Sequence, residues 1–190
     1  MKKLFTPTPS STFAPTPVRY HPALVTLHWL LAVLILVALS MGTLVLKEIP
    51  NSSPEKLWAL KGHMVAGALI LLLTLLRLAV RLKTAHPAPA ATGHPLLDRL
   101  APLMHGGLYA LVLVMAGSGI AMSVLAGLPE TVFWGVGQLP VNFDHLVPRA
   151  VHGWAAKLLM LAVALHAAAG LYHHFIRRDG LLRRMGFGKP

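Results

Sequence analysis

The sequence predicts an all-α integral membrane protein built as a bundle of four transmembrane helices. Of its 190 residues, 55% are hydrophobic and only 12% are charged, and the mean hydropathy of +0.64 is higher than in ordinary soluble domains. Four apolar runs are each long enough to cross a hydrocarbon layer of about 30 Å. Most of the 17 lysines and arginines stand near the ends of these runs, so the net charge of +11 indicates membrane orientation and contact with anionic lipid headgroups rather than with nucleic acid.

The elements are expected in a simple order along the chain. Residues 1–20 begin with two lysines and continue with Thr, Ser and Pro, without the apolar core of a signal peptide, which predicts a disordered cytoplasmic tail. Residues 126–149 are polar to aromatic and predict a folded external loop or a short interfacial helix. The four-helix domain is expected over residues 21–187, with transmembrane helices at about 24–46, 57–82, 102–125 and 150–176.

The basic residues predict the orientation. The tail, the second connection and the C-terminal end, with the helix ends beside them, carry 12 lysines and arginines against 2 aspartates. The other two connections balance 4 basic against 4 acidic residues. By the positive-inside rule, both termini are expected in the cytoplasm.

The absence of cysteine excludes several kinds of site. A chain with no cysteines has no thiolate metal site, iron–sulfur cluster, disulfide or covalent attachment of c-type haem. It also has no Gly-rich fingerprint that opens a helix after a strand, so we expect it to bind neither NAD nor ATP. Any haem is therefore held noncovalently, and any electrons come from outside the protein.

Histidines carry the functional signal. His152, His166 and His173 are separated by 14 and 7 residues and so lie along one stripe of the last helix. The first two stand about 21 Å apart along the helix axis, which puts one near each membrane surface. A six-coordinate haem iron needs two axial ligands at the same depth. His63 therefore pairs with His152 in the outer half, and His28 pairs with His166 in the inner half. Two stacked haems would give an electron path across the bilayer.

Each pairing has an alternative. His28 and His63 could belong to interfacial polar belts, and His152 could satisfy a loop carbonyl. His166 lies deep in an apolar helix, where an unpaired imidazole is costly, so it is expected to be functional. His105 lies close enough in depth to compete with His28 or His166 as a ligand, and otherwise serves as a hydrogen-bond partner of a haem propionate.

Arg77 follows His63 by 14 residues and shares its helix face. Its guanidinium is expected to meet the propionates of the inner haem, because a guanidinium binds carboxylates in a bidentate way. The alternative is that Arg77 and Arg81 only mark the cytoplasmic end of the helix.

Four segments carry a family resemblance. The chain resembles the bacterial four-helix cytochrome b561 family, which is related to the membrane cytochrome b subunits of hydrogenases, over about residues 19–187. The segments are YHPALVTLHW, KGHMVAGALILLLTLLRLAVRLK, LMHGGLYALVLVMAGSGIAM and VHGWAAKLLMLAVALHAAAGLYHHFIRRDGLLRRM. The resemblance implies a bacterial inner-membrane protein with two b haems, whose ligand positions fall on His28, His63, His152 and His166. It also implies a superoxide oxidase that passes electrons to ubiquinone.

The expected function is electron transfer from an external one-electron donor to ubiquinone. Superoxide is the first candidate for this donor. One alternative is an electron-transfer subunit that docks on a hydrogenase or dehydrogenase. The other is a haem-free transporter of metal ions, in which the histidines form a relay.

The quinone site is expected at the inner end of the last helix. Quinone reduction consumes protons, and histidine is the side chain suited to deliver them near neutral pH. His173 shares the stripe of His166 about 10 Å further along the axis, so we assign it as quinone hydrogen-bond donor and proton source. His174 is rotated away by about 100° and ranks second. The alternative is that both histidines belong to a polar belt that anchors the helix to headgroups.

Overall fold

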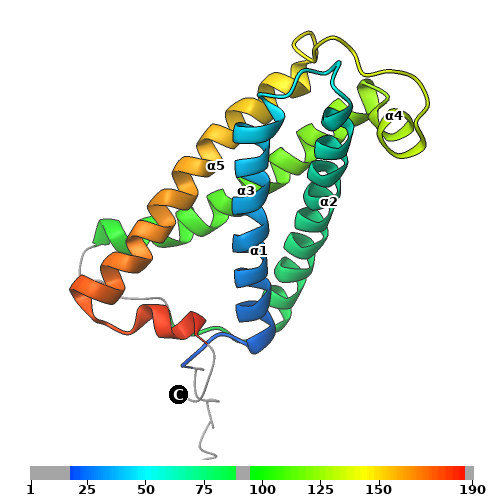
Figure 1. Ribbon diagram of the computed structural model, residues 1–190. Helices are drawn as coiled ribbons and strands as arrows, with labels where there is room; N and C mark the ends of the chain where they lie inside the picture. Colours follow the sequence, from blue (N-terminus) through cyan, green and yellow to red (C-terminus); the bar gives the residue numbers. More distant parts are fainter. Residues whose placement is uncertain (1–17, 89–94, 187–190) are drawn as a thin grey trace, which may run out of the picture.

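The computed structural model describes residues 18–88 and 95–186, and within these ranges every regular element is a helix (Figure 1). Four of them are long and apolar enough to cross a membrane, which confirms the predicted fold class. Residues 1–17 of the expected tail lie outside the described residues. The elements in chain order are α1 (Pro22–Ser40), η1 (Met41–Leu46), α2 (Pro54–Lys83), α3 (Pro95–Leu125), α4 (Leu128–Trp134), α5 (Val147–Tyr172), η2 (His173–Arg177) and η3 (Leu181–Met185).

Prolines begin most of these helices. Pro22 and Pro54 stand in the first turns of α1 and α2, where a missing N–H costs no intrahelical bond. In α1 the cap is His21, whose Nδ1 accepts from the N–H of Ala23 at 3.2 Å. The start of α3 lies at Pro95, upstream of the expected residue 102, and Pro102 is contained within the helix. The earlier proline starts the helix, and the later one removes one hydrogen bond and adds some strain without ending the helix.

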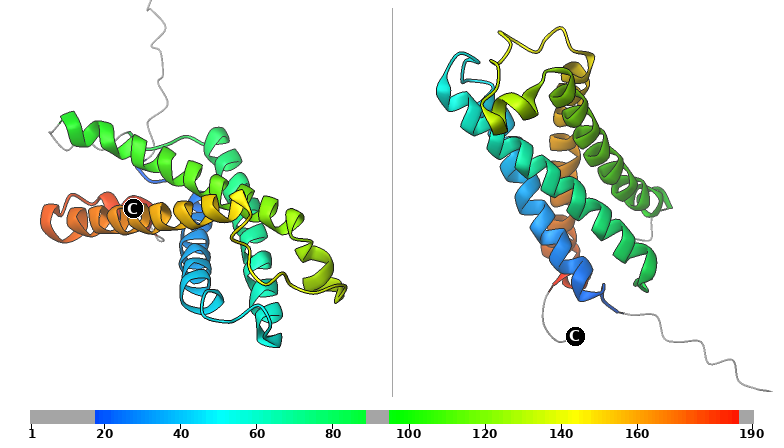
Figure 2. Two further views of the ribbon diagram at one scale, coloured as in Figure 1. Left: turned by 90° about the horizontal axis from the view of Figure 1, so that it is seen from above. Right: turned by 90° about the vertical axis from the view of Figure 1, so that its right-hand side faces the viewer.

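The four long helices pack as two pairs. Helix α1 packs along α2, α3 packs along α5, and α2 joins the two pairs by packing against α3. No comparable contact joins α1 and α5, and Figures 1 and 2 show these helices diverging toward the end that carries η3. The bundle is therefore open on its α1–α5 side.

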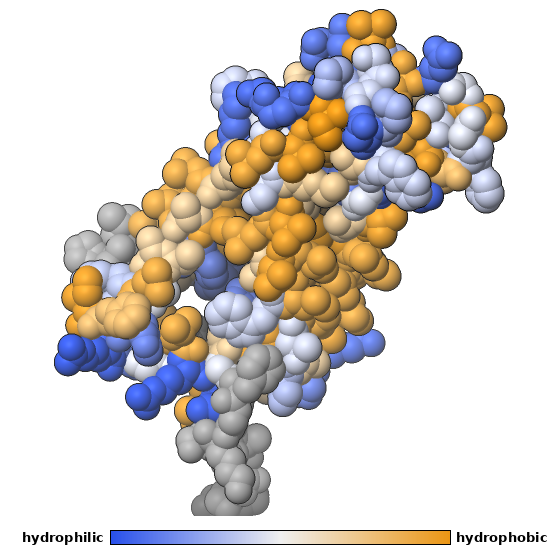
Figure 3. Space-filling model, in the orientation of Figure 1, coloured by the Kyte–Doolittle hydropathy of each residue, from blue (hydrophilic) through white to orange (hydrophobic). Residues whose placement is uncertain are grey.

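Two apolar clusters hold the pairs together. The central cluster joins all four long helices, and the second lies at the end of the bundle where α4 packs on α2 and α3. Large apolar side chains cover much of the outer surface as well, as expected for helices solvated by lipid (Figure 3). The buried members are Leu31, Leu39, Ile70, Val112 and Leu159 in the first cluster and Leu46, Ala59, Leu60, Leu128 and Val132 in the second.

The chain after α5 folds back beneath the bundle. Arg178 (φ 53°) and Gly180 (φ 75°) adopt left-handed backbone conformations. Helix η3 then runs from the C-terminal end of the last long helix toward the start of α1 (Figure 1). We call residues 178–185 the C-terminal clasp. Three hydrogen bonds attach it: the N–H of Tyr20 to the carbonyl of Arg184 (3.3 Å), Nε1 of Trp29 to the carbonyl of Met185 (2.9 Å), and NH1 of Arg184 to the carbonyl of Ala88 (2.7 Å).

Candidate functional site

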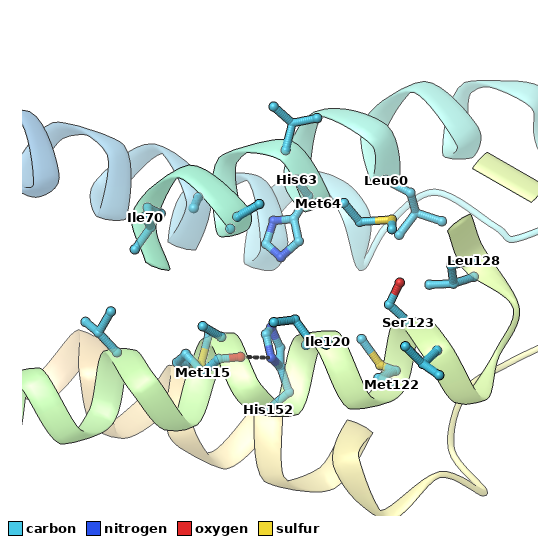
Figure 4. Close-up of a pocket in the computed structure, with 18 of the residues that line it drawn as sticks. Leu60, His63, Met64, Ile70, Met115, Ile120, Met122, Ser123, Leu128 and His152 are labelled. Carbon is cyan, nitrogen blue, oxygen red and sulfur yellow. Dashed lines mark hydrogen bonds between the residues drawn. The ribbon is translucent and has the colours of Figure 1, made fainter. Parts of the chain in front are cut away.

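The outer pair of histidines faces across the bundle. His63 projects from α2 and His152 from α5, with their ring centroids 6.1 Å apart and the ring planes at 75° (Figure 4). An imidazole nitrogen lies about 2.0 Å from a metal that it ligates and about 1.1 Å from its own ring centre, so two imidazoles on opposite sides of one metal have centroids roughly 6 Å apart. The observed separation suits two axial ligands of one iron.

The inner pair repeats this separation. His28 of α1 and His166 of α5 have ring centroids 6.1 Å apart and planes at 70°. His105 of α3 also approaches His166, with centroids 5.4 Å apart. This second separation is shorter than an opposed pair of axial ligands requires, so the distances favour His28 as the partner of His166.

Backbone carbonyls fix the tautomers of two of these rings. Nδ1 of His152 lies 3.0 Å from the carbonyl oxygen of Met115, and a carbonyl only accepts, so this nitrogen carries the proton. Nδ1 of His105 donates in the same way to the carbonyl of Ala101 at 2.8 Å. In both rings Nε2 is left with a free lone pair, which is the arrangement found in metal-ligating histidines. Nδ1 of His63 is buried without a hydrogen-bond partner among the described residues.

Two glycines make room for the outer rings. A Cβ atom added at Gly42 would lie 3.4 Å from Cε1 of His63, and one added at Gly119 would lie 3.3 Å from Cε1 of His152. Gly42 belongs to η1, a π-helical turn that continues α1, and such turns are common at functional sites. Each outer imidazole thus rests on backbone that carries no side chain.

A cavity of about 400 Å³ surrounds the outer pair. Figure 4 shows His63 and His152 pointing into it from opposite sides, among aliphatic and methionine side chains. Leu128 and Phe133 of α4 line its outer end, so this short helix covers the cavity. The sequence predicts a folded external loop or a short interfacial helix in this region but carries no signal that places it at the site.

A polar pair lies beside the inner histidines. NH1 of Arg77 donates to the hydroxyl of Tyr109, and the guanidinium carbon lies 5.3 Å from the centre of the Tyr109 ring. Nε of Arg77 is buried without a partner among the described residues. Sequence reasoning missed Tyr109, although it follows His105 by four residues and therefore shares its helix face.

The donor set fits a haem better than a bare metal ion. Within residues 18–88 and 95–186, no group of three or more His, Asp or Glu side chains is suited to hold a metal ion. A haem brings four nitrogen ligands of its own and needs only two imidazoles from the protein. Its propionates would also supply an anion for the Arg77 guanidinium, whose Nε has no hydrogen-bond partner among the described residues.

The two candidate proton donors at the inner end of α5, His173 and His174, have different surroundings. Nδ1 of His173 lies 2.5 Å from Oδ2 of Asp179, and the two side chains are 15% and 33% exposed. His174 is exposed and packs its ring edge-on against Phe175, with centroids 4.7 Å apart. The hydrogen bond from His173 lowers the pKa of the Asp179 carboxyl, and the N–H of Leu181 adds to the effect.

An opening lies between the helices that carry the inner pair. Figure 3 shows the surface hollowed between α5 and α1, above η3, with hydrophilic residues inside the hollow. This hollow lies on the side where α1 and α5 do not pack together. A ligand dissolved in the bilayer could approach the inner histidines from this side.

Comparisons with known proteins show the family of this chain. A family model described as "Prokaryotic cytochrome b561" matches residues 19–188. The chain is 27% identical over 184 residues to "Cytochrome b561 homolog 2" of Escherichia coli (strain K12), a match that covers 92% of this chain and 94% of that protein. It is 28% identical over 172 residues to "Probable superoxide oxidase CybB" of Yersinia pestis, covering 88% and 95%. A third relative, "Cytochrome b562" of Cereibacter sphaeroides, is 29% identical over 164 residues, covering 85% and 90%. The chain therefore belongs to the prokaryotic cytochrome b561 family of multi-pass membrane electron-transfer proteins, and membership implies that it binds haem b.

Proposed function

We propose that this protein holds two b haems and carries single electrons from superoxide, on the outer side of the bacterial inner membrane, to ubiquinone. The observation that carries the proposal is the equal separation of the imidazole rings in two histidine pairs. Two histidine pairs have the same separation, 6.1 Å between ring centroids, and they are the two pairs that the sequence predicts. Superoxide as the donor is supported by the similarity to the Yersinia pestis protein named as a probable superoxide oxidase.

In the outer site, His63 and His152 would hold the haem iron. Haem b supplies an iron that gains and loses one electron without leaving its ligands. The carbonyl of Met115 holds the proton on Nδ1 of His152, so Nε2 is free to ligate. Gly42 and Gly119 let both rings adopt this position. Helix α4 excludes water from the outer end of the cavity.

In the inner site, His28 and His166 would hold the haem iron. Arg77 binds the propionates, with its guanidinium held by the Tyr109 hydroxyl. His105 presents Nε2 toward the same site and is the second candidate partner of a propionate. Both haem sites share α5, where the ligands lie about 21 Å apart along the axis.

Ubiquinone is reduced beside the inner site. The hollow between α1 and α5 gives a lipid-soluble quinone access from the bilayer (Figure 3). His173 lies on the same stripe of α5 as His166 and donates a hydrogen bond and a proton to the quinone. His174 points elsewhere, against Phe175, and remains the second candidate.

The test is spectroscopy followed by rapid kinetics on the purified protein. The reduced-minus-oxidised visible spectrum should show two low-spin bis-histidine b haems per chain. Stopped-flow mixing with superoxide should reduce them, and a ubiquinone analogue should reoxidise them. Protein without haem would favour a metal transporter, and haem protein that is inert to both reagents would favour a subunit that needs a partner enzyme.

A further inference from the structure

We infer that Asp179 is a positioning residue that aims His173 for proton delivery to the quinone. The inference rests on the proposed ubiquinone site at the inner end of α5. It concerns the pair formed by His173 of η2 and Asp179 of the C-terminal clasp.

Both oxygens of the Asp179 carboxylate are engaged. Oδ2 accepts from Nδ1 of His173 at 2.5 Å, and Oδ1 accepts from the N–H of Leu181 at 3.1 Å. The other charged group at the pair is Arg177, whose Nε lies 3.7 Å from Oδ2. Because the carboxylate holds the proton on Nδ1, Nε2 is the nitrogen of His173 that can give up or take up a proton.

The backbone is folded to bring these residues together. On a continuing α-helix, residue 179 would lie about 9 Å beyond His173 along the axis and be rotated by about 240°. The π-helical η2 and the left-handed residues Arg178 and Gly180 instead turn the chain back on itself. A left-handed conformation at a residue with a Cβ atom costs about 1 kcal/mol, so the turn is maintained against a local penalty.

The pair is placed between water and the bundle. Asp179 is one-third exposed, whereas the His173 ring is mostly covered. Water can therefore reach the carboxylate more readily than the imidazole. The lowered pKa of Asp179 is consistent with a carboxylate that stays ionised while its partner exchanges protons.

The proton transfer to the quinone needs only His173, Asp179 and water. Ubiquinone takes two electrons, which arrive one at a time through the inner site, and two protons. For each proton, the Nε2–H bond of protonated His173 breaks as an O–H bond forms on the quinone. Nδ1 keeps its proton, Asp179 stays ionised and stabilises the imidazolium before transfer, and water reprotonates Nε2.

The decisive variant is Asp179→Asn. The amide oxygen of asparagine can still accept from the Leu181 N–H, so the cap of η3 is kept. Its NH₂ group then faces Nδ1 of His173, where it favours the wrong tautomer. We expect reoxidation by a ubiquinone analogue to slow by at least about tenfold, the order of loss expected when general acid catalysis is impaired. The solvent deuterium isotope effect on that step should rise, while reduction by superoxide remains unchanged.

Three further proteins complete the experiment. His173→Ala should be slowed at least as much, and His173→Ala/Asp179→Asn should be no slower than His173→Ala alone, because Asp179 acts through His173. Asp144→Asn removes a carboxylate from the connection between α4 and α5 and should reoxidise at the normal rate.

The outcomes are separable. Normal reoxidation in His173→Ala overturns the proposed quinone site. A slow His173→Ala with a normal Asp179→Asn keeps the site and overturns the role of Asp179. Further slowing in the double variant, or loss of a haem band in Asp179→Asn, assigns Asp179 to the folding of the clasp and also overturns the inference.

Discussion

At the scale of single residues, the histidines of the two proposed haem sites differ in how their rings are held. His152 and His105 each donate Nδ1–H to a helix carbonyl, whereas Nδ1 of His63 has no partner among the described residues. A hydrogen bond of this kind makes an imidazole a stronger ligand. The two axial ligands of the outer haem are therefore expected to be unequal, with His152 the firmer one.

Replacement of single histidines tests the pairing. His63→Ala or His152→Ala should remove the outer haem and spare most of the inner one, because each pair supplies both ligands of one iron. His28→Ala and His166→Ala should behave as the complementary set. The measurement is haem content per chain together with the reduced-minus-oxidised spectrum.

His105 provides the counter-test of the inner pairing. Its ring is nearer to His166 than an opposed ligand requires, so His105→Ala should retain the inner haem. Loss of that haem to the extent seen in His166→Ala would replace His28 by His105 as the ligand.

Gly119 gives a finer test of the outer site. A methyl group there would lie 3.3 Å from Cε1 of His152, which is tighter than ordinary contact, so the ring must shift by a few tenths of an ångström. We expect Gly119→Ala to weaken binding of the outer haem and to change its redox potential. Gly117→Ala on the same helix meets nothing within 4 Å and should leave both haems unchanged. Equal behaviour of the two variants would show that the contact with His152 has no role.

At the scale of elements, apolar runs and prolines predict the long helices because both act locally. The structure confirms four apolar spans. The predicted start of α3 is seven residues too late because Pro102 resembles a helix start, although a proline inside a helix costs only one hydrogen bond and some strain. The clasp is not predictable in this way, because it depends on left-handed residues and on hydrogen bonds to segments more than 90 residues away in sequence, as in the pairs Trp29–Met185 and Ala88–Arg184.

The clasp can be loosened by removing one hydrogen bond at Trp29, whose ring also packs edge-on against His28 with centroids 5.2 Å apart. Trp29→Phe keeps the aromatic ring but removes the hydrogen bond to the carbonyl of Met185. Such a bond contributes about 1 kcal/mol, so opening of the clasp should become about fivefold more frequent. Hydrogen exchange of residues 181–185 should quicken accordingly. Trp58→Phe, at an exposed side chain near the other end of the bundle, is the matched control, and equal exchange in both variants would contradict the contact.

At the scale of the whole molecule, the histidine spacing predicts which histidine rings face each other but not which helices pack together. Depth along a helix follows from residue count alone, so the spacing is sufficient to match His63 with His152. Which helices stay apart depends on side-chain packing over the entire bundle. The separation of α1 from α5, which opens the inner site to the bilayer, follows from that packing and has no local signal.

The positions of the chain ends and of the basic residues bear on the orientation of the protein in the membrane. Both described chain ends lie at the end of the bundle that carries η3, where the N–H of Tyr20 bonds to the carbonyl of Arg184. At the opposite end, Lys56 is buried and donates to the carbonyls of Leu46 and Ile49, so it adds little to the surface charge there. The basic excess therefore stays at the η3 end, as the sequence predicts.

The last prediction follows from this charge asymmetry. By the positive-inside rule, a reporter fused after Pro190 should score cytoplasmic, and one inserted near Gly137, between α4 and α5, should score external. The reason is that translocating the basic connections and the clasp would oppose both the insertion machinery and the membrane potential. A matched pair of reporters, one active only in the cytoplasm and one active only outside, gives each position its own control. The opposite labelling would put His173 and the quinone site on the external side, and protons for quinone reduction would then come from outside the cell.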